Sequence, residues 1–137
     1  MAWKQYFTLQ NIDGFETYEY IDKEVLTLPK YLQQPPGRCV SFRNCKQLID
    51  ISPLHNWDAS KFTSFNRLFD HCYKLWDITP LSFWDTSNVT DMSYSFSDCY
   101  RLSDITPLQQ WNVTSVTNMQ HMFYSCSIYN IDCISKW

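Results

Sequence analysis

Several residue types recur at a constant 27-residue step along most of this chain. Residues at the same place in successive repeats form a column, and many columns share one register. The clearest columns are Cys45, Cys72, Cys99 and Cys126; Trp57, Trp84 and Trp111; Phe42, Phe69, Phe96 and Phe123; Pro53, Pro80 and Pro107; and Leu48, Leu75 and Leu102. The register holds from about residue 41 to about residue 127 and degrades after Cys126.

The repeat length limits the architectures that the chain can adopt. One such unit cannot bury its own apolar face, whereas stacked units cover one another. Propeller blades need about 40–45 residues and paired-helix repeats about 33 or more, while leucine-rich-repeat-like coils use about 20–29. We therefore expect an α/β solenoid: a leucine-rich-repeat-like right-handed coil of about four units, each with a short strand, a turn and a short helix.

Local signals place these elements within a unit. A short strand is expected near Leu102–Ile105, followed by Thr106-Pro107, an N-cap residue with proline at the first helical position. After the N-cap candidate Ser87, an apolar set is spaced by 3, 4 and 3 residues, which predicts a helix of about two to three turns. That set is Val89, Met92, Phe96 and Cys99.

Residues 1–40 lie outside the repeat. Two aromatic-rich runs, Trp3–Leu9 and Phe15–Ile21, flank Asn11-Ile12-Asp13-Gly14, a pattern that predicts a β-hairpin. We expect residues 1–40 to form an N-terminal cap of hairpin plus connector, and residues 41–137 to form the repeats with a clipped last unit.

Composition excludes several function classes. Gly14 and Gly37 are the two glycines of the chain, too few for a Walker loop or a dinucleotide fingerprint. The net charge of −3 and the lack of a Lys/Arg run argue against nucleic acid as a partner. No apolar stretch is long enough to span a membrane, and the start does not resemble a secretory signal. We expect a reducing compartment, or a leader removed from the sequence.

Three strings and one ending resemble the repeat of BspA-type leucine-rich-repeat surface proteins. They are Asp50-Ile-Ser-Pro-Leu-His-Asn-Trp-Asp58, Trp84-Asp-Thr-Ser-Asn-Val-Thr-Asp-Met92, Trp111-Asn-Val-Thr-Ser-Val-Thr-Asn-Met119 and Met122-Phe-Tyr-Ser-Cys126. The resemblance covers residues 41–127. It implies adhesion or protein interaction without catalytic residues, in a family found on bacterial and mycoplasmal surfaces, in gut protists and in giant viruses. A short member without a signal fits a giant-virus adaptor or virion component.

Three columns have both a functional and a structural interpretation. The cysteines could bind metal or form disulfides. Because the sequence has no Cys-x-x-Cys pair, we expect free thiols packed in the core. Two disulfides outside the column are left open, Cys39 with Cys45 and Cys126 with Cys133. The tryptophans could form an exposed platform, but their spacing favours the core with the indole N–H on a backbone carbonyl. The column Asp50, Asp77 and Asp104 could bind calcium, but bonding to turn amides is the simpler expectation.

Aromatic residues that do not repeat are the best candidates for function. They stand where other units carry polar residues, which indicates the surface, and exposed Tyr and Trp commonly anchor protein interfaces. The candidates are Tyr73, Trp76, Phe83, Tyr94, Tyr100 and Tyr124, with the face of Asp50, Asp77 and Asp104 as a second possibility. His55, His71 and His121 share no spacing and suggest no catalytic set.

These observations favour a non-catalytic protein–protein interaction or structural assembly module, without cofactor or metal, in a virion or in host cytoplasm. The alternative is an extracellular adhesin that binds host protein or glycan at the cell surface, if a leader was removed.

Overall fold

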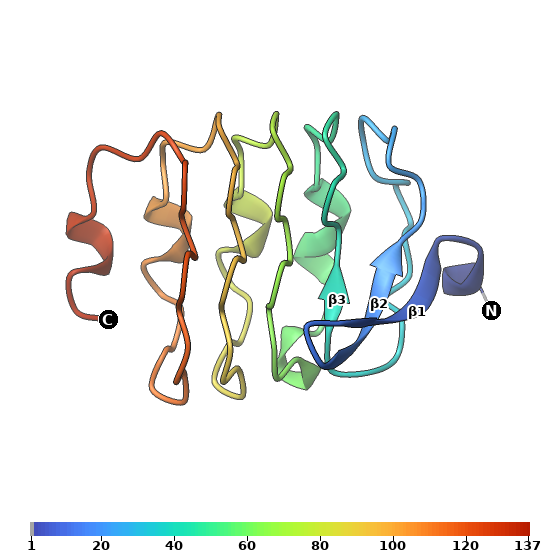
Figure 1. Cartoon of the computed structure of the whole chain (residues 1–137), viewed down its shortest axis with the longest axis horizontal. Coiled ribbons are helices and arrows are strands. Elements are labelled where there is room, and N and C mark those ends of the chain that lie inside the picture. Colours follow the sequence, from blue (N-terminus) through green and yellow to red (C-terminus); the bar gives the residue numbers. More distant parts are fainter. Residues whose placement is uncertain (1) are drawn as a thin grey trace.

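The fold contains short strands and 3-10 helices joined by long segments without regular secondary structure (Figure 1). A computed structural model describes residues 2–137. Strands β1 (Phe7–Ile12), β2 (Phe15–Tyr20) and β3 (Val40–Ser41) form one sheet in the order β1-β2-β3. The remaining elements are 3-10 helices: η1 (Ala2–Gln5), η2 (Ser52–Asn56), η3 (Ala59–Lys61), η4 (Thr79–Leu81), η5 (Thr106–Leu108) and η6 (Asp132–Ile134).

The predicted N-terminal hairpin is confirmed. Strands β1 and β2 pair antiparallel from Phe7↔Tyr20 to Ile12↔Phe15, and β2 pairs parallel with β3. The two turn residues, Asp13 and Gly14, have positive φ values of 53° and 90°, the conformation that a tight two-residue hairpin turn requires. The ring of Phe7 packs against Phe42 and Trp57, so the hairpin covers apolar side chains at the start of the repeats.

The predicted α/β solenoid of about four strand–turn–helix units is wrong. Between residues 2 and 137 the structure has one three-stranded sheet and 3-10 helices of three to five residues, and it has no α-helix. The segment 102–105, predicted as a strand, is irregular, and the segment 89–99, predicted as a helix, consists of successive turns and bends.

Backbone hydrogen bonding explains why residues 89–99 do not form a helix. An α-helix needs each N–H to reach the carbonyl four residues earlier. Here Met92 donates to the carbonyl of Asn118 at 2.8 Å, and Tyr94 donates to that of Gln120 at 2.9 Å. The backbone also has positive φ at Tyr94 and Asp98, which ends any right-handed helical run. The 3, 4, 3 spacing therefore reports burial along a chain of turns.

The left-handed positions follow the same step along the sequence as the core. They form two columns, Asn44, His71, Asp98 and Ser125, and Arg67, Tyr94 and His121. Asn, Asp and His tolerate this conformation better than most side chains. The repeat therefore fixes backbone geometry as well as apolar burial.

Backbone bonds also join each unit to the next. Alternate N–H groups from Phe65 to His71 donate to carbonyls from Asp91 to Ser97, and those from Met92 to Asp98 donate to carbonyls from Asn118 to Tyr124, at 2.7–3.0 Å. Isolated parallel bridges link Ser64 with Asp91 and Asp91 with Asn118. Consecutive units consequently lie side by side, with the hairpin at one end and residues 118–137 at the other (Figure 1).

Side chains from each column fill the space between units. Phe42, Phe69, Phe96 and Phe123 stack successively, with ring centroids 5.5, 5.8 and 5.7 Å apart. The tryptophan column is buried as predicted, and the indole N–H of Trp57, Trp84 and Trp111 donates to the carbonyls of Leu32, Leu54 and Leu81.

The cysteine column belongs to the same core. All six cysteines are free thiols, and Cys45, Cys72 and Cys99 are fully buried. Cys72, Cys99 and Cys126 each donate to a phenylalanine carbonyl of the preceding unit at 3.0–3.3 Å. Burial raises the pKa of Cys45 and of Cys126 to about 12, so these thiols are weak nucleophiles.

Candidate interaction surface

Four of the six aromatic candidates come together on the surface. Tyr73, Tyr94, Tyr100 and Tyr124 are linked through ring contacts with each other and with two histidines. Trp76 is 55% exposed and Phe83 is 96% exposed, and neither shares a ring contact with this group among the described residues. The structure therefore groups part of the predicted set and leaves Trp76 and Phe83 apart.

One row of the surface follows the column 46, 73, 100. The ammonium of Lys46 lies 5.5 Å from the ring centroid of Tyr73, and the rings of Tyr73 and Tyr100 stack at 4.8 Å with 16° between their planes. A cation over an aromatic face is attracted by the electron-rich ring. Each residue comes from a different unit. The distance between the two rings is therefore set by the ladder of backbone hydrogen bonds that joins neighbouring units.

A second row follows the column 67, 94, 121. The guanidinium of Arg67 lies 4.2 Å from the ring centroid of Tyr94, and the ring of Tyr94 lies 5.2 Å from that of His121. His121 then meets Tyr124 edge to face at 5.1 Å. Both rows thus begin with a cation and continue with two rings.

Charged groups connect the two rows. Arg67 Nη1 donates to Asp70 Oδ2 at 2.6 Å, and Asp70 Oδ1 lies 2.7 Å from His71 Nδ1. His71 Nε2 lies 3.3 Å from Asp98 Oδ2, and the His71 ring lies 5.8 Å from that of Tyr73. We call the connected set the aromatic face; it comprises Lys46, Arg67, Asp70, His71, Tyr73, Tyr94, Asp98, Tyr100, His121 and Tyr124.

The N-terminal hairpin is tied to this face. Arg67 Nε donates to Asp13 Oδ2 at 2.6 Å, so the hairpin turn and the second row share one guanidinium. Burial opposes ionisation of Asp13, but the hydrogen bond and charge of Arg67 outweigh it and lower the pKa of Asp13. Burial and the nearby charge of Asp98 raise the pKa of Tyr100, so its phenol remains protonated at neutral pH.

Asp70, His71 and Asp98 could offer three ligand atoms to a cation. Those atoms lie within 4.8 Å of one another. The second oxygen of Asp70 is already bonded to Arg67, and both ring nitrogens of His71 face carboxylates. In this arrangement the cluster is a network of mutually bonded polar side chains that links the two rows.

Reading each histidine in its column could have found this network. His71 shares a column with Asp98, and His121 shares one with Arg67 and Tyr94. Comparing the histidines only with each other hid that relationship. Lys46 and Arg67 were not predicted either. Only aromatic residues were considered in the columns that vary between units, although Lys46 shares a column with Tyr73 and Arg67 shares one with Tyr94.

The aspartate column lies apart from the aromatic face and serves the turns. Oδ1 of Asp50, Asp77 and Asp104 accepts the backbone N–H of Ser52, Thr79 and Thr106 at 2.8–3.0 Å. The predicted bonding to turn amides is confirmed. The predicted N-cap role of Thr106 is wrong: Thr106 is the first residue of η5, and Ile105 stands at the N-cap without a side-chain hydrogen bond. The aspartate two residues before each of Ser52, Thr79 and Thr106 supplies the acceptor for the first N–H of the 3-10 helix instead.

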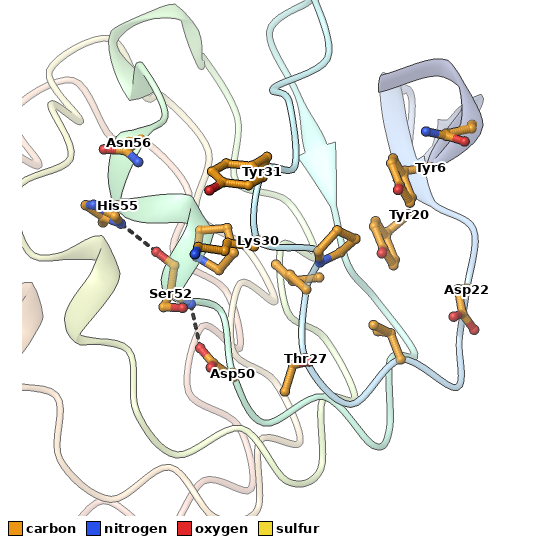
Figure 2. A pocket seen from close by; sticks show the side chains of 15 residues that line it. Tyr6, Tyr20, Asp22, Thr27, Lys30, Tyr31, Asp50, Ser52, His55 and Asn56 are labelled. Carbon is orange, nitrogen blue, oxygen red and sulfur yellow. Dashed lines mark hydrogen bonds between the residues drawn. The ribbon is translucent and has the colours of Figure 1, made fainter. Parts of the chain in front are cut away.

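A hollow with a volume of about 960 Å³ lies between the hairpin side and η2 (Figure 2). Asp50, Ser52 and His55 line it, a trio that resembles a catalytic set by composition. Both bonds between them use the backbone of Ser52: its N–H donates to Asp50, and its carbonyl lies 2.7 Å from His55 Nδ1. These contacts stabilise the 3-10 turn and leave the Ser52 hydroxyl without an activating base.

The ladder, the shared core and the repeated turns define a protein built from side-by-side units of constant length. The chain belongs to the family described as "Mycoplasma protein of unknown function, DUF285", which matches residues 40–137. This match is consistent with the resemblance to BspA-type repeats and leaves the hairpin outside the matched region. Comparisons with curated proteins and with solved structures gave no match. None of the helices in residues 2–137 has the length and apolar character to cross a bilayer.

Proposed function

We propose that this chain is a non-catalytic protein-binding module whose aromatic face takes a partner protein. The observation that carries the proposal is the meeting on one surface of four tyrosines that lie outside the core columns and come from three different units. Tyr100 and Tyr124 are 49% and 57% exposed. Exposed tyrosines grouped beside Arg and His are typical of interface anchors, and an aromatic cluster of this size marks a binding site more often than a free surface.

The orientation of the rings favours a protein over a sugar. Sugar platforms present an open aromatic face, whereas Lys46 and Tyr100 lie on either side of the Tyr73 ring. That ring therefore presents its edge and hydroxyl. The Tyr100 and Tyr124 hydroxyls and the His121 imidazole supply directional bonds for a polypeptide surface. We propose a partner within a larger assembly, in a virion or in host cytoplasm, with an adhesin at a cell surface as the alternative.

Two observations support a function without catalysis. In the hollow beside η2, Asp50 and His55 bond to backbone atoms of Ser52. The core thiols, which could act as nucleophiles, are buried, and desolvation raises the pKa of Cys72 and Cys99 well above the ordinary value.

The test is affinity capture from the source organism, followed by affinity measurement with the purified captured protein. Tyr100→Ala and Tyr124→Ala should each weaken binding at least tenfold, which corresponds to about 1.4 kcal/mol. Phe83→Ala is the matched control, because it removes an exposed ring that has no place in the aromatic face. Equal affinity for all four proteins would contradict the proposal. Specific binding of the wild type to glycans, lost in Tyr100→Ala, would favour the adhesin.

A further inference from the structure

Three exposed apolar side chains from successive segments form a row on one side of the molecule. Leu26 is 56% exposed, Ile49 38% and Trp76 55%. The N–H of Ile49 donates to the carbonyl of Leu26 at 2.8 Å, so these two segments lie side by side. Trp76 stands one repeat after Ile49, in the same column. We call Leu26, Ile49 and Trp76 the apolar row.

The apolar row runs between two stripes of side chains that differ in charge. One column lies two residues before Ile49 and Trp76 and is the basic stripe, and the column one residue after them is the acidic stripe. The members are Gln47, Lys74 and Arg101 in the basic stripe, and Asp50, Asp77 and Asp104 in the acidic stripe. Lys74 Nζ donates to Gln47 Oε1 at 2.7 Å, so side chains of one column meet across the gap between units. Because each unit crosses the row once, the two stripes follow opposite edges of the row.

The charged groups of both stripes are exposed, and none of the ion pairs formed within residues 2–137 includes them. Each aspartate accepts a turn amide through Oδ1, which leaves its second oxygen for another donor. Lys74 is bonded to the neutral amide of Gln47. An apolar centre edged by polar and charged groups is the usual anatomy of a protein interface, and Trp is a frequent anchor there. The surface around Trp76 has this anatomy.

The arrangement of the two stripes is complementary to itself. A second copy turned by 180° about an axis parallel to the apolar row places its own row against that of the first copy. This rotation exchanges the two edges, so the acidic stripe of each copy faces the basic stripe of the other. An axis in the interface plane but perpendicular to the row would put like charges opposite each other. The facing pairs in the favourable arrangement are Asp77 with Lys74, Asp104 with Arg101, and Asp50 with Gln47.

We propose that this protein forms a symmetric homodimer through the apolar row and its two stripes. The charge pattern selects a second copy as the occupant, because that copy brings the opposite charge to each stripe while it covers the exposed face of Trp76. Complementary charges fix the alignment of the two rows. Both copies use the same surface, so the contact is closed at two molecules.

Sedimentation velocity of the full chain over a wide concentration range tests the proposal. The wild type should pass from monomer to dimer as the concentration rises and form nothing larger. Trp76→Ala should move this transition to at least tenfold higher concentration, because it removes an apolar anchor of the contact. Phe83→Ala is the matched control, since it removes an exposed ring outside the apolar row and should leave the transition unchanged. Thermal melting at a dilution where all three proteins are monomeric checks that the variants fold.

Charge reversal gives the sharpest test. Asp77→Lys puts cations in both stripes of one unit, and Lys74→Glu puts carboxylates in both, so each variant alone should dimerise at least tenfold more weakly. An equimolar mixture should restore the dimer, since each reversed residue then faces its opposite charge in the other copy. Asp85→Lys is the matched control: like Asp77, Asp85 is exposed and bonds a turn amide, but it lies outside both stripes. Asp104→Lys with Arg101→Glu repeats the test one unit later if Asp77→Lys melts early.

A wild type that stays monomeric throughout would overturn the proposal. So would an association that Trp76→Ala and Asp77→Lys leave unchanged, an assembly larger than a dimer, or a mixture that associates no better than the two variants alone. Tyr124→Ala should dimerise like the wild type, because Tyr124 belongs to the aromatic face and lies outside both stripes. That variant separates this contact from partner binding at the aromatic face.

Discussion

Tyr73 and Tyr100 stand one full repeat apart in the chain, yet their rings stack with centroids 4.8 Å apart. That distance matches the spacing between paired strands, about 4.7–4.9 Å. The isolated parallel bridge between Ser64 and Asp91 joins the same two units. Ring stacking on the surface is therefore a direct consequence of the backbone register beneath it.

This stacking should appear as a measurable coupling between the two tyrosines. In a double-mutant cycle with Tyr73→Ala and Tyr100→Ala, urea unfolding should give a coupling free energy of about 0.5–1.5 kcal/mol. Each single change should cost little more than that, because both rings lie at the surface. A coupling free energy of zero would mean that the rings contribute to stability independently and do not stack in solution.

The buried tryptophans should dominate stability. Trp84→Ala should lower the unfolding free energy by about 3–5 kcal/mol, because it empties a site shared by two units. Trp84→Phe should cost less, mainly through the lost N–H bond to the Leu54 carbonyl at 2.9 Å. The matched control is Trp76→Ala, since Trp76 is 55% exposed. If thermal melting showed Trp76→Ala and Trp84→Ala to be equally destabilised, the assignment of Trp84 to the core would be wrong.

Thiol reactivity should separate the core cysteines from the C-terminal one. Cys72 and Cys99 are fully buried, and desolvation raises the pKa of both, while Cys133 is only partly buried. Iodoacetamide on the folded protein should label Cys133 first and reach Cys72 and Cys99 only after unfolding. Peptide mapping by mass spectrometry measures this order. Early labelling of Cys99 would show that the last units open readily.

Acid should weaken the contact between the hairpin and the first unit. Burial opposes ionisation of Glu19, but Arg43 at 2.7 Å and Lys23 at 3.1 Å outweigh it and lower its pKa. A carboxyl whose pKa is lower in the folded state stabilises the fold above its unfolded pKa, and the effect is lost as the pH falls through the folded pKa.

Glu19→Gln should therefore lower the unfolding free energy at pH 7 by about 1–3 kcal/mol, and by much less at pH 3. Urea unfolding at both pH values measures the difference. Glu16→Gln, at an exposed position of the same strand, should change little at either pH. An equal loss for Glu19→Gln at pH 7 and pH 3 would contradict the electrostatic explanation.

The left-handed columns allow a test of the repeat geometry. Ser125 has φ of 60° and an exposed side chain. Ser125→Val should cost about 1–2 kcal/mol, because a β-branched residue is strained in this conformation. Ser125→Gly should be neutral or slightly stabilising, since glycine adopts positive φ freely. Equal melting temperatures for the two variants would contradict the assigned backbone conformation.

The sequence predicts the core well because the buried residue types recur at a constant step along the chain. The tryptophan, phenylalanine and cysteine columns lie inside, and Asp13-Gly14 forms the expected turn. The fold class could not be predicted in the same way. The spacing of Val89, Met92, Phe96 and Cys99 fits both a helix face and a chain of turns. The decisive partner of the Met92 N–H is the carbonyl of Asn118, which belongs to the next unit.

The candidate surface was predictable in part. Non-repeating rings identified Tyr73, Tyr94, Tyr100 and Tyr124, because substitution within a column reports exposure. Their grouping depends on backbone register and on charged neighbours such as Arg67, which spacing among rings does not reveal.

Hydroxyl-radical footprinting of the complex tests most directly whether the aromatic face binds a partner protein. The method reports solvent access of side chains, and Tyr, His and Trp are all reactive. We predict that the partner protects Tyr94, Tyr100 and Tyr124, while Phe83 and Trp76 keep the oxidation rates of the free protein. Protection confined to Phe83, Trp76 or the hollow beside η2, with Tyr100 and Tyr124 still reactive, would contradict the account.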